Sequence, residues 1–406
     1  MIKLNIGVTL ANAQNVSVGE LVVGDPDVQG RLQGQFRYST DYLNHPEAFA
    51  LDPIHLPLTP ENFNAERPHS GVHGVFEDSL PDDWGRRILA RRYQLERKEQ
   101  RVPQLLTVLG GQGMGALSYS LDDVAPEKDK DVDGQYLSEL LRLAGKFEED
   151  ATSIDEDLAL LFQAGSSPGG ARPKALIKES NRFFLAKFSS IRDQFDVVAL
   201  EAATMELARR AGVSAAPTKL VSCGTGKVLL VERFDIENTT MGRYHLISMQ
   251  TLLKAEGYYN AGYRDIADII RLVSTNPGDD LLKLFKQLLF NVMIGNTDDH
   301  LKNFCMIFDG DGWKLSPAFD LVPNIGLNRE HVLRIGYHNV VANKEVLIQE
   351  AKNFGIKQQV KADEIIMAVF TEVSRWEKVF REFDVPNRDV QILGRDIEAR
   401  MAGINS

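Results

Sequence analysis

The chain of 406 residues is 43% apolar and 25% charged, contains two cysteines and has a formal net charge of −11. This length predicts two to three domains at roughly 150 residues each, and the charge argues against a broad electrostatic grip on nucleic acid. Two cysteines cannot build a disulfide framework, and no apolar run forms a signal peptide or approaches the ~18 residues of a membrane span. We therefore expect a globular cytoplasmic protein without a membrane partner.

The N-terminal part of the chain is expected to form strands and turns followed by one amphipathic helix. Ser79-Leu-Pro-Asp82 has the form of a capping box, which predicts a helix from there through Arg97 with apolar residues such as Trp84 at helical spacing. Basic side chains share the opposite face and could contact phosphates, although a solvated face is the commoner outcome of such a pattern. These residues are Arg86, Arg87, Arg91, Arg92, Arg97 and Lys98.

Two glycine-rich segments differ in what they predict. Residues 110–117, Gly-Gly-Gln-Gly-Met-Gly-Ala-Leu, have neither the spacing of a dinucleotide loop nor a following Lys-Ser/Thr, so they predict a tight turn between strands. Ser166-Ser-Pro-Gly-Gly-Ala-Arg-Pro-Lys174 is a flexible loop directly before two apolar runs. Between the two loops, residues 122–157 hold 13 acidic and 4 basic side chains, a pattern typical of a solvated connector.

The runs 175–178 and 183–188 flank a polar turn and predict a β-hairpin. Alternation places Lys187 on one face of the second strand, and Phe184, Ala186 and Phe188 on the other. A lone strand lysine usually lies at an edge or snorkels to water, but a glycine-rich loop just upstream favours a functional lysine. Helices are then predicted over 195–212, 247–253, 263–273 and 281–294, and in the tail from 360 to 401.

A polar cluster, Gly295-Asn-Thr-Asp-Asp-His-Leu-Lys-Asn303, separates two apolar runs. Asp298 and Asn303 stand five residues apart, the separation found in the protein-kinase catalytic loop, where the Asp accepts the substrate proton and the Asn holds Mg²⁺. A predicted strand, turn and return strand then deliver Asp320, in the place of a second metal-binding Asp. An isolated Asn-Thr-Asp would instead suggest a loop of turn-capping side chains.

The order of these features supports phosphoryl transfer more strongly than any one of them does. Glycine-rich loop, Lys187, a helix acid, Asp298, Asn303 and Asp320 follow one another as in a kinase. A metal-dependent phosphohydrolase could also use Asp298, Asp299, His300 and Asp320, but it would leave the upstream loop and the strand lysine unexplained.

At these positions the sequence resembles the HipA family of serine/threonine kinases, the toxins of bacterial toxin–antitoxin modules. The resemblance covers nearly the whole chain. It is carried by residues 76–82, Phe-Glu-Asp-Ser-Leu-Pro-Asp; 231–235, Val-Glu-Arg-Phe-Asp; 291–303, Asn-Val-Met-Ile-Gly-Asn-Thr-Asp-Asp-His-Leu-Lys-Asn; and 315–323, Leu-Ser-Pro-Ala-Phe-Asp-Leu-Val-Pro. The last two segments are highly specific.

The resemblance implies roles for individual residues. Asp298 is the catalytic base, with His300 and Lys302 bracing the loop and contacting phosphate, while Asn303 and Asp320 bind Mg²⁺. Lys187 is the phosphate lysine and Glu232 with Phe234 forms the adenine-facing hinge. The ATP-binding positions as a whole are Ser167, Gly169, Gly170, Ala171, Lys174, Lys187, Glu232 and Phe234, and Ser167 matches the serine that the family autophosphorylates.

Three features depart from the pattern that the resemblance implies. Pro168 and Pro173 stiffen the glycine-rich loop. Asp299 places an additional negative charge beside the catalytic Asp, where a small residue would serve. Glu201 is a candidate partner of the lysine only because it lies on the following helix, and Asp196 competes with it.

Together these features predict an α+β, protein-kinase-like two-lobed fold, with a mixed β-rich N-lobe and a mainly helical C-lobe, behind an N-terminal mainly β subdomain. The boundaries expected are 1–125 for the subdomain, 126–157 for the acidic connector, 158–245 for the N-lobe and 246–406 for the C-lobe. The expected function is transfer of the ATP γ-phosphoryl group to a protein Ser or Thr. The alternative is a nucleotide-binding co-repressor that acts through an antitoxin–DNA complex with weak or no catalysis.

The partners are implied by the family resemblance alone. It implies a helix-turn-helix antitoxin of the HipB type, contact with DNA only through that antitoxin and, for some members, an aminoacyl-tRNA synthetase as substrate. ATP and Mg²⁺ are the cofactors that both functions would use.

Overall fold

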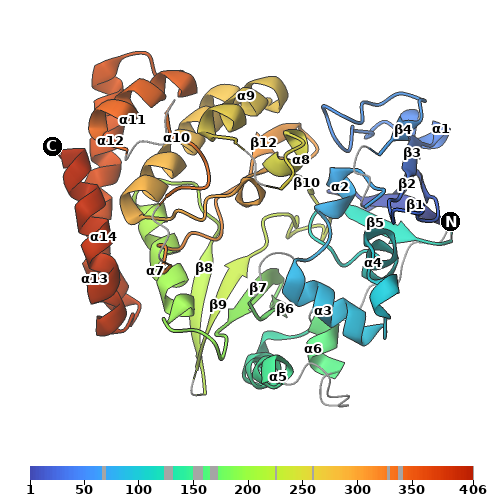
Figure 1. Cartoon of the computed structure of the whole chain (residues 1–406), viewed down its shortest axis with the longest axis horizontal. Coiled ribbons are helices and arrows are strands. Elements are labelled where there is room, and N and C mark those ends of the chain that lie inside the picture. Colours follow the sequence, from blue (N-terminus) through green and yellow to red (C-terminus); the bar gives the residue numbers. More distant parts are fainter. Residues whose placement is uncertain are drawn as a thin grey trace. The chain divides into compact units, whose positions relative to one another are not determined.

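The computed structural model of the chain describes residues 1–65, 70–122, 131–149, 159–164, 172–224, 226–257, 260–326, 330–336 and 342–405. The chain divides into two compact units, and Figure 1 labels their helices and strands. Unit 1 comprises Met1–Ser190, Arg233–Ile247 and Ile307–Gly312, and unit 2 comprises Ile191–Glu232, Ser248–Met306 and Trp313–Ser406. The bounds of these two units differ from the predicted domain boundaries, and the domain boundaries remain a prediction. Among the described residues, no helix has the length and apolar character needed to cross a membrane.

Unit 1 contains a five-stranded antiparallel sheet of the N-terminal residues, in the order β4-β3-β2-β1-β5. Its strands are β1 (Ile2–Thr9), β2 (Asn15–Val23), β3 (Gly34–Tyr38), β4 (Phe63–Asn64) and β5 (Leu117–Ser120). Polar and apolar residues alternate in β1, so Leu4, Ile6 and Val8 are buried on one face. This sheet confirms the mainly β character expected of the N-terminal region.

Unit 1 also contains helices. They are α1 (Thr40–Leu43), α2 (Gly74–Glu77), α3 (Asp83–Arg92), α4 (Val102–Leu109), α5 (Leu137–Glu149) and α6 (Ala159–Ala164), with 3₁₀ helices η1 (Arg97–Glu99) and η2 (Gly134–Tyr136). Helix α1 packs against β2, and α4 packs against β5. The glycine-rich segment 110–117 connects α4 to β5. It is therefore a turn between a helix and a strand, not between two strands.

The predicted capping box at Ser79 is wrong. Asp82 precedes the first residue of α3, and the Ser79 hydroxyl is hydrogen-bonded to the Tyr119 hydroxyl at 2.6 Å. The helix also ends at Arg92 and not at Arg97, because Gln94 has a φ of 51° and leaves the helical path. The Ser79 side chain, which could cap a helix, is instead hydrogen-bonded to a residue 40 positions away.

The arginine-rich face of α3 is not simply solvated. The Arg87 guanidinium lies 5.4 Å from the centre of the Phe147 ring, Arg92 donates to the Phe162 carbonyl oxygen at 3.2 Å, and Arg86 donates to the Pro81 carbonyl oxygen at 2.8 Å. Arg86, Arg87 and Arg92 therefore contact the protein itself, which is a third outcome besides phosphate binding and solvation.

The predicted solvated connector is also wrong where the structure describes it. Residues 137–149 form α5, whose Leu140, Leu143 and Phe147 are buried. The Trp84 ring packs edge-on against the Phe147 ring with 5.3 Å between the ring centres. The high net charge of the segment conceals apolar residues at helical spacing, which bury one face of α5 while the acidic residues face water.

The predicted hairpin that carries Lys187 is confirmed. Strands β6 (Lys174–Glu179) and β7 (Arg182–Phe188) pair antiparallel around Ser180, which adopts a φ of 57°. Phe184, Ala186 and Phe188 are buried as the alternation predicted, while Lys187 on the other face is half-buried.

Unit 2 is mainly helical. Helix α7 (Val197–Arg210) packs against the hairpin of β8 (Thr218–Cys223) and β9 (Gly226–Glu232). Helix α10 (Pro277–Ile294) is buried on almost every side, against α9 (Tyr263–Val273), α12 (Gln359–Val373) and α14 (Asn387–Asn405). The other elements of unit 2 include α8 (Met249–Leu252), η4 (Leu301–Asn303), β12 (Trp313–Leu315), α11 (Lys344–Ala351), η5 (Lys352–Phe354) and α13 (Trp376–Glu382). The strands β10 (His245–Ser248) and β11 (Cys305–Phe308) each have residues in both units. The predicted C-terminal helical tail thus consists of α12, α13 and α14.

Candidate active site

The polar segment 295–303 begins where α10 ends. Gly295 closes the helix with a φ of 76°, a left-handed conformation that glycine adopts without strain. A β-carbon at this position would lie 2.9 Å from Asp396 Oδ2 and 3.0 Å from Arg400 Nε of α14. The left-handed turn therefore favours glycine, two side chains of α14 lie close beside it, and the buried helix places the next residues at a fixed point.

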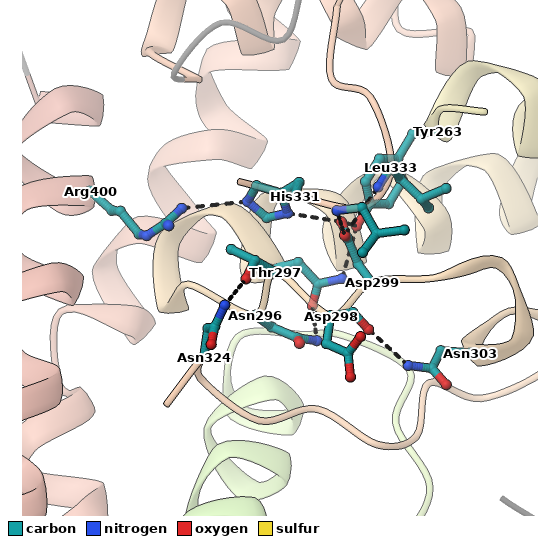
Figure 2. A network of polar contacts seen from close by, with 12 residues as sticks. Tyr263, Asn296, Thr297, Asp298, Asp299, Asn303, Asn324, His331, Leu333 and Arg400 are labelled. Atoms are coloured by element: carbon teal, nitrogen blue, oxygen red, sulfur yellow. Dashed lines mark hydrogen bonds and ion pairs between the residues drawn. The ribbon is translucent and has the colours of Figure 1, made fainter. Parts of the chain in front are cut away.

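The two consecutive aspartates of the segment lie in opposite environments (Figure 2). Asp298 is exposed, whereas Asp299 retains only 1% of its accessible surface. Asp298 can therefore be reached by a hydroxyl group from outside the chain, and Asp299 cannot. The additional charge of Asp299 therefore faces the interior and not the solvent side on which Asp298 lies.

Asp298 and Asn303 are brought together as their spacing predicted. The Asn303 amide donates through Nδ2 to the Asp298 carbonyl oxygen at 3.1 Å, and the Asn303 N–H donates to the His300 carbonyl oxygen at 2.9 Å. Half-buried His300 precedes the short helix η4, on which Lys302 is exposed. Because Asn303 donates through its nitrogen, its oxygen Oδ1 remains as a hard ligand of the kind that Mg²⁺ prefers.

Asp299 accepts hydrogen bonds from four groups. The Tyr263 hydroxyl donates to Oδ2 at 2.7 Å, the N–H groups of Val332 and Leu333 reach Oδ1 at 2.9 and 3.3 Å, and His331 Nδ1 lies 2.9 Å from Oδ2. Burial, and then the negative charge of Asp299, raise the pKa of Tyr263 well above its ordinary value, so its hydroxyl remains a donor. Since both carboxylate oxygens are engaged, Asp299 is a poor metal ligand, which disfavours the phosphohydrolase that would need it.

A second layer of polar contacts supports the start of the loop. Asn291 donates to the Tyr263 hydroxyl oxygen at 2.9 Å and accepts from Asn296 at 3.1 Å. On the other side, the Asn324 N–H donates to the Gly295 carbonyl oxygen at 2.8 Å, and its side chain donates to the Thr297 hydroxyl. The backbone around Asp298 is thus held from both sides. Sequence analysis assigned no role to Tyr263, Asn291 and Asn324: Asn291 lies within the quoted segment 291–303, but no local spacing links Tyr263 or Asn324 to the loop.

Asp320 follows β12 by five residues and has a φ of 59°. A non-glycine residue in this region is uncommon, and such conformations are often found at functional sites. Within the described ranges, no group of three or more His, Cys, Asp or Glu side chains could hold a metal ion. A nucleotide-bound Mg²⁺ needs only one or two protein oxygens besides those of the phosphates, so Asn303 and Asp320 fit such a site by their donor chemistry.

The predicted nucleotide lysine has a second lysine opposite it in unit 1. Lys187 of β7 pairs in register with Lys174 of β6, which is 4% exposed. Directly opposed residues project to the same face of an antiparallel pair, where like charges are unfavourable. Lys187 and Lys174 therefore lie on the same face of the hairpin.

Two residues of the predicted hinge motif 231–235, Arg233 and Asp235, make structural contacts. Glu232 ends β9 in unit 2, and half-buried Phe234 lies in unit 1. Arg233 and Asp235 are buried and form an ion pair at 2.6 Å, and Asp235 accepts from the Gly115 N–H at 2.7 Å. The motif thus anchors the turn 110–117, whose Gly113 and Gly115 carbonyl oxygens accept from Arg243 at 2.9 and 3.2 Å. This use of its backbone supports the prediction of a structural turn.

The remaining predicted site residues are placed only in part. Ser167, Gly169, Gly170 and Ala171 lie outside the described residues. Glu201 is buried in α7 at 4% exposure. Its rival Asp196 accepts from the Ala199 N–H at 3.0 Å and pairs with Lys227 at 3.2 Å, so it has a structural role at the start of α7.

A hairpin with a strand lysine and a mainly helical unit with an Asp–Asn loop are the parts of a two-lobed, α+β, protein-kinase-like fold. Residues 166–376 match the HipA-like C-terminal domain, and residues 13–120 match the HipA N-terminal domain. The chain belongs to the HipA family.

Individual relatives agree with this membership. "Putative kinase Y4mE" of Sinorhizobium fredii is 26% identical over 359 residues, 78% of this chain and 81% of that protein. The "Serine/threonine-protein kinase toxin HipA" of Shewanella oneidensis is 32% identical over 140 residues, 29% of this chain and 32% of that protein. A chain in the solved complex of HipA, HipB and operator DNA from Shewanella oneidensis MR-1 has the same fold, with a TM-score of 0.69 at 16% identity over 98% of this chain and 96% of that one. The names of the relatives support a kinase-type activity in general.

Proposed function

We propose that this chain is a serine/threonine protein kinase that transfers the γ-phosphoryl group of ATP to a protein hydroxyl. The observation that carries the proposal is the loop in which exposed Asp298 is hydrogen-bonded to Asn303 through its own carbonyl oxygen. An exposed carboxylate can accept the proton of an incoming hydroxyl, and the amide oxygen of Asn303 is suited to a metal ion beside it.

Other residues are proposed to bind Mg²⁺ and the nucleotide. Mg²⁺ bound with ATP would neutralise part of the phosphate charge, held by Asn303 and Asp320. Lys187 and Lys174 place two positive charges on one face of their hairpin, suited to phosphate oxygens. Glu232 and Phe234 are proposed to face the adenine, and His300 and Lys302 to brace the loop and contact phosphate.

The test is incubation of the purified chain with γ-labelled ATP, Mg²⁺ and a library of Ser- and Thr-containing peptides. We expect label in the peptides or in the chain itself, and transfer lower by a factor on the order of 10² to 10⁴ with Asp298→Asn. Binding of ATP without any labelled product would contradict the proposal and favour the co-repressor.

Regulation by autophosphorylation is part of the proposal. Ser167 matches the family's modified serine, and a phosphate there would add about −1.5 to −2 charges near the ATP phosphates and lower ATP affinity. Mass spectrometry of the same reaction should find the modification at Ser167, and its absence would contradict this control. We also propose a HipB-type antitoxin as partner, because the similar solved chain is from a complex with HipB and operator DNA. An aminoacyl-tRNA synthetase substrate stays a prediction from the family resemblance.

A further inference from the structure

The buried carboxylate of Asp299 has no role in the proposed chemistry, yet it is the most heavily hydrogen-bonded side chain of the loop. A carboxylate transferred from water into the interior is costly unless donors surround it. Asp299 is surrounded by one hydroxyl, two backbone N–H groups and one imidazole, all within 3.3 Å. We infer that this arrangement has a function in the loop that carries Asp298.

The hydrogen-bond chemistry extends the cluster to α14. A carboxylate can only accept, so His331 Nδ1 must carry the hydrogen that points to Asp299. In the neutral imidazole this leaves Nε2 as an acceptor, and Arg400 Nη1 lies 3.5 Å from it, while Arg400 Nε donates to Asp396 at 2.8 Å. A continuous polar chain therefore runs from α14 through His331 to Asp299 (Figure 2).

Three of the four donors to Asp299 come from residues 330–336, a segment that is itself anchored. Within residues 330–336, Arg334 forms a parallel β-bridge with Gly262 at the start of α9. The Arg334 N–H donates to the Ala261 carbonyl oxygen at 3.0 Å. The Val332 N–H, besides its bond to Asp299, lies 3.1 Å from the Thr297 carbonyl oxygen. Asp299 thus joins the loop to a segment that α9 holds in place.

The contacts of Asp299 act on Asp298 through the peptide group that joins the two residues. The carbonyl oxygen of Asp298, on one side of that peptide, is fixed by Asn303, and the side chain of Asp299, on the other side, is fixed by its four donors. With the peptide held at both ends, the direction in which Asp298 leaves the backbone is set, and only its own side-chain torsions remain.

We propose that Asp299 is a positioning residue that clamps residues 330–336 to the loop and thereby aims Asp298 at the acceptor hydroxyl. The proposal rests on the proposed kinase function for its kinetic consequence, but the clamp itself can be measured without any activity. A misplacement of about 1 Å at a reacting group can cost ~10²-fold in rate, which sets the size of the effect.

The experiment compares Asp299→Ala, Asp299→Asn and Tyr263→Phe with the control Asp389→Ala. Asp389 is also 1% exposed and accepts a backbone N–H, that of Asp196 at 2.9 Å, but it does not contact the loop. Three quantities are measured: hydrogen–deuterium exchange at Val332 and Leu333, nucleotide dissociation constant, and rate of phosphate transfer to the acceptor used by the wild type.

For Asp299→Ala we expect faster exchange at Val332 and Leu333, a transfer rate lower by ~10²-fold and a nucleotide dissociation constant within about twofold of wild type. Asp299→Asn keeps one acceptor oxygen for the N–H groups and should lose less, and Tyr263→Phe, which removes one donor, should lose least. The control should lose thermal stability without any of these changes. This split between rate and nucleotide affinity separates positioning from a general loss of structure.

Several outcomes would overturn the inference. They are unchanged exchange at Val332 and Leu333 in Asp299→Ala, a wild-type transfer rate in that variant, or a rate loss of the same size in Asp389→Ala. If Asp299→Ala does not fold, Asp299→Asn and Tyr263→Phe decide by the same criteria. If the wild type transfers no phosphate, the proposed function fails, and the exchange measurement alone decides whether the clamp exists.

Discussion

The ion pair of Arg233 and Asp235 predicts a large and specific loss of stability. Both side chains are buried, at 3% and 0% exposure, and two bonds join them, at 2.6 and 3.0 Å. Asp235 also accepts from the Gly115 N–H at 2.7 Å. Substitution Asp235→Ala would therefore leave a buried guanidinium without its carboxylate and a buried N–H without its acceptor.

The size of the loss follows from these contacts. Removal of one partner of a buried ion pair costs about 3–5 kcal/mol, and an unsatisfied N–H adds about 1–3 kcal/mol. Arg233 keeps a bond of 3.3 Å to the Gly113 carbonyl oxygen, which reduces the sum. We expect a decrease of about 4 kcal/mol in the free energy of unfolding, or roughly 8–16 °C in the melting temperature for a unit of this size.

Urea unfolding followed by circular dichroism measures this decrease. The matched control is Asp27→Ala, which breaks an exposed Asp–Arg pair of the same unit, with 2.8 Å between Asp27 and Arg31, and should leave the unfolding midpoint unchanged. Burial alone would raise the pKa of Asp235, but Arg233, Arg243 and the Gly115 N–H outweigh it and lower that pKa. The stabilisation is therefore complete above the ordinary Asp pKa of about 3.9, and the difference between wild type and Asp235→Ala should shrink as pH falls below it. A loss below about 1 kcal/mol at neutral pH, or one that does not depend on acid, would refute the reasoning.

Three further predictions concern the loop, the metal and a buried histidine. Asp298→Asn should keep nucleotide affinity and lose phosphoryl transfer by on the order of 10² to 10⁴, and near-full activity would remove Asp298 as the base. Asp320→Asn should weaken Mg²⁺-dependent nucleotide binding, which an unchanged Mg²⁺ titration by calorimetry would contradict. Burial lowers the pKa of His245 from 6.5 to about 4, so its neutral form is favoured on folding and stability is lost as pH falls below 6.5. Between pH 7 and 5 the wild type should lose about 2 kcal/mol more than His245→Gln in urea unfolding, and equal losses would show that His245 does not titrate in this way.

The helices and strands that could be predicted from the sequence are those determined by residues close together in the chain. The β6–β7 hairpin was predicted because alternation and a polar turn lie within 15 residues, and α9 because its apolar residues recur at helical spacing. The prediction of a solvated connector was wrong for a physical reason. Net charge is summed over a whole segment, whereas burial depends on which face of the helix carries the apolar residues. Leu140, Leu143 and Phe147 make one face of α5 buried despite the acidic residues around them.

The candidate site shows the same division between local and distant causes. Asp298 and Asn303 could be paired from the sequence because a bond between residues five apart is closed by the loop itself. The role of Asp299 could not, since Tyr263 is 36 residues away and Val332 and Leu333 are 33 and 34 away, at positions that nothing in their spacing connects to it. The sequence shows two identical carboxylates side by side, and only the distant donors decide that one is buried and structural while its neighbour stays exposed. The distant contacts of Asp299 hold its carboxylate in the interior, and in the proposal above they set the direction in which Asp298 leaves the backbone.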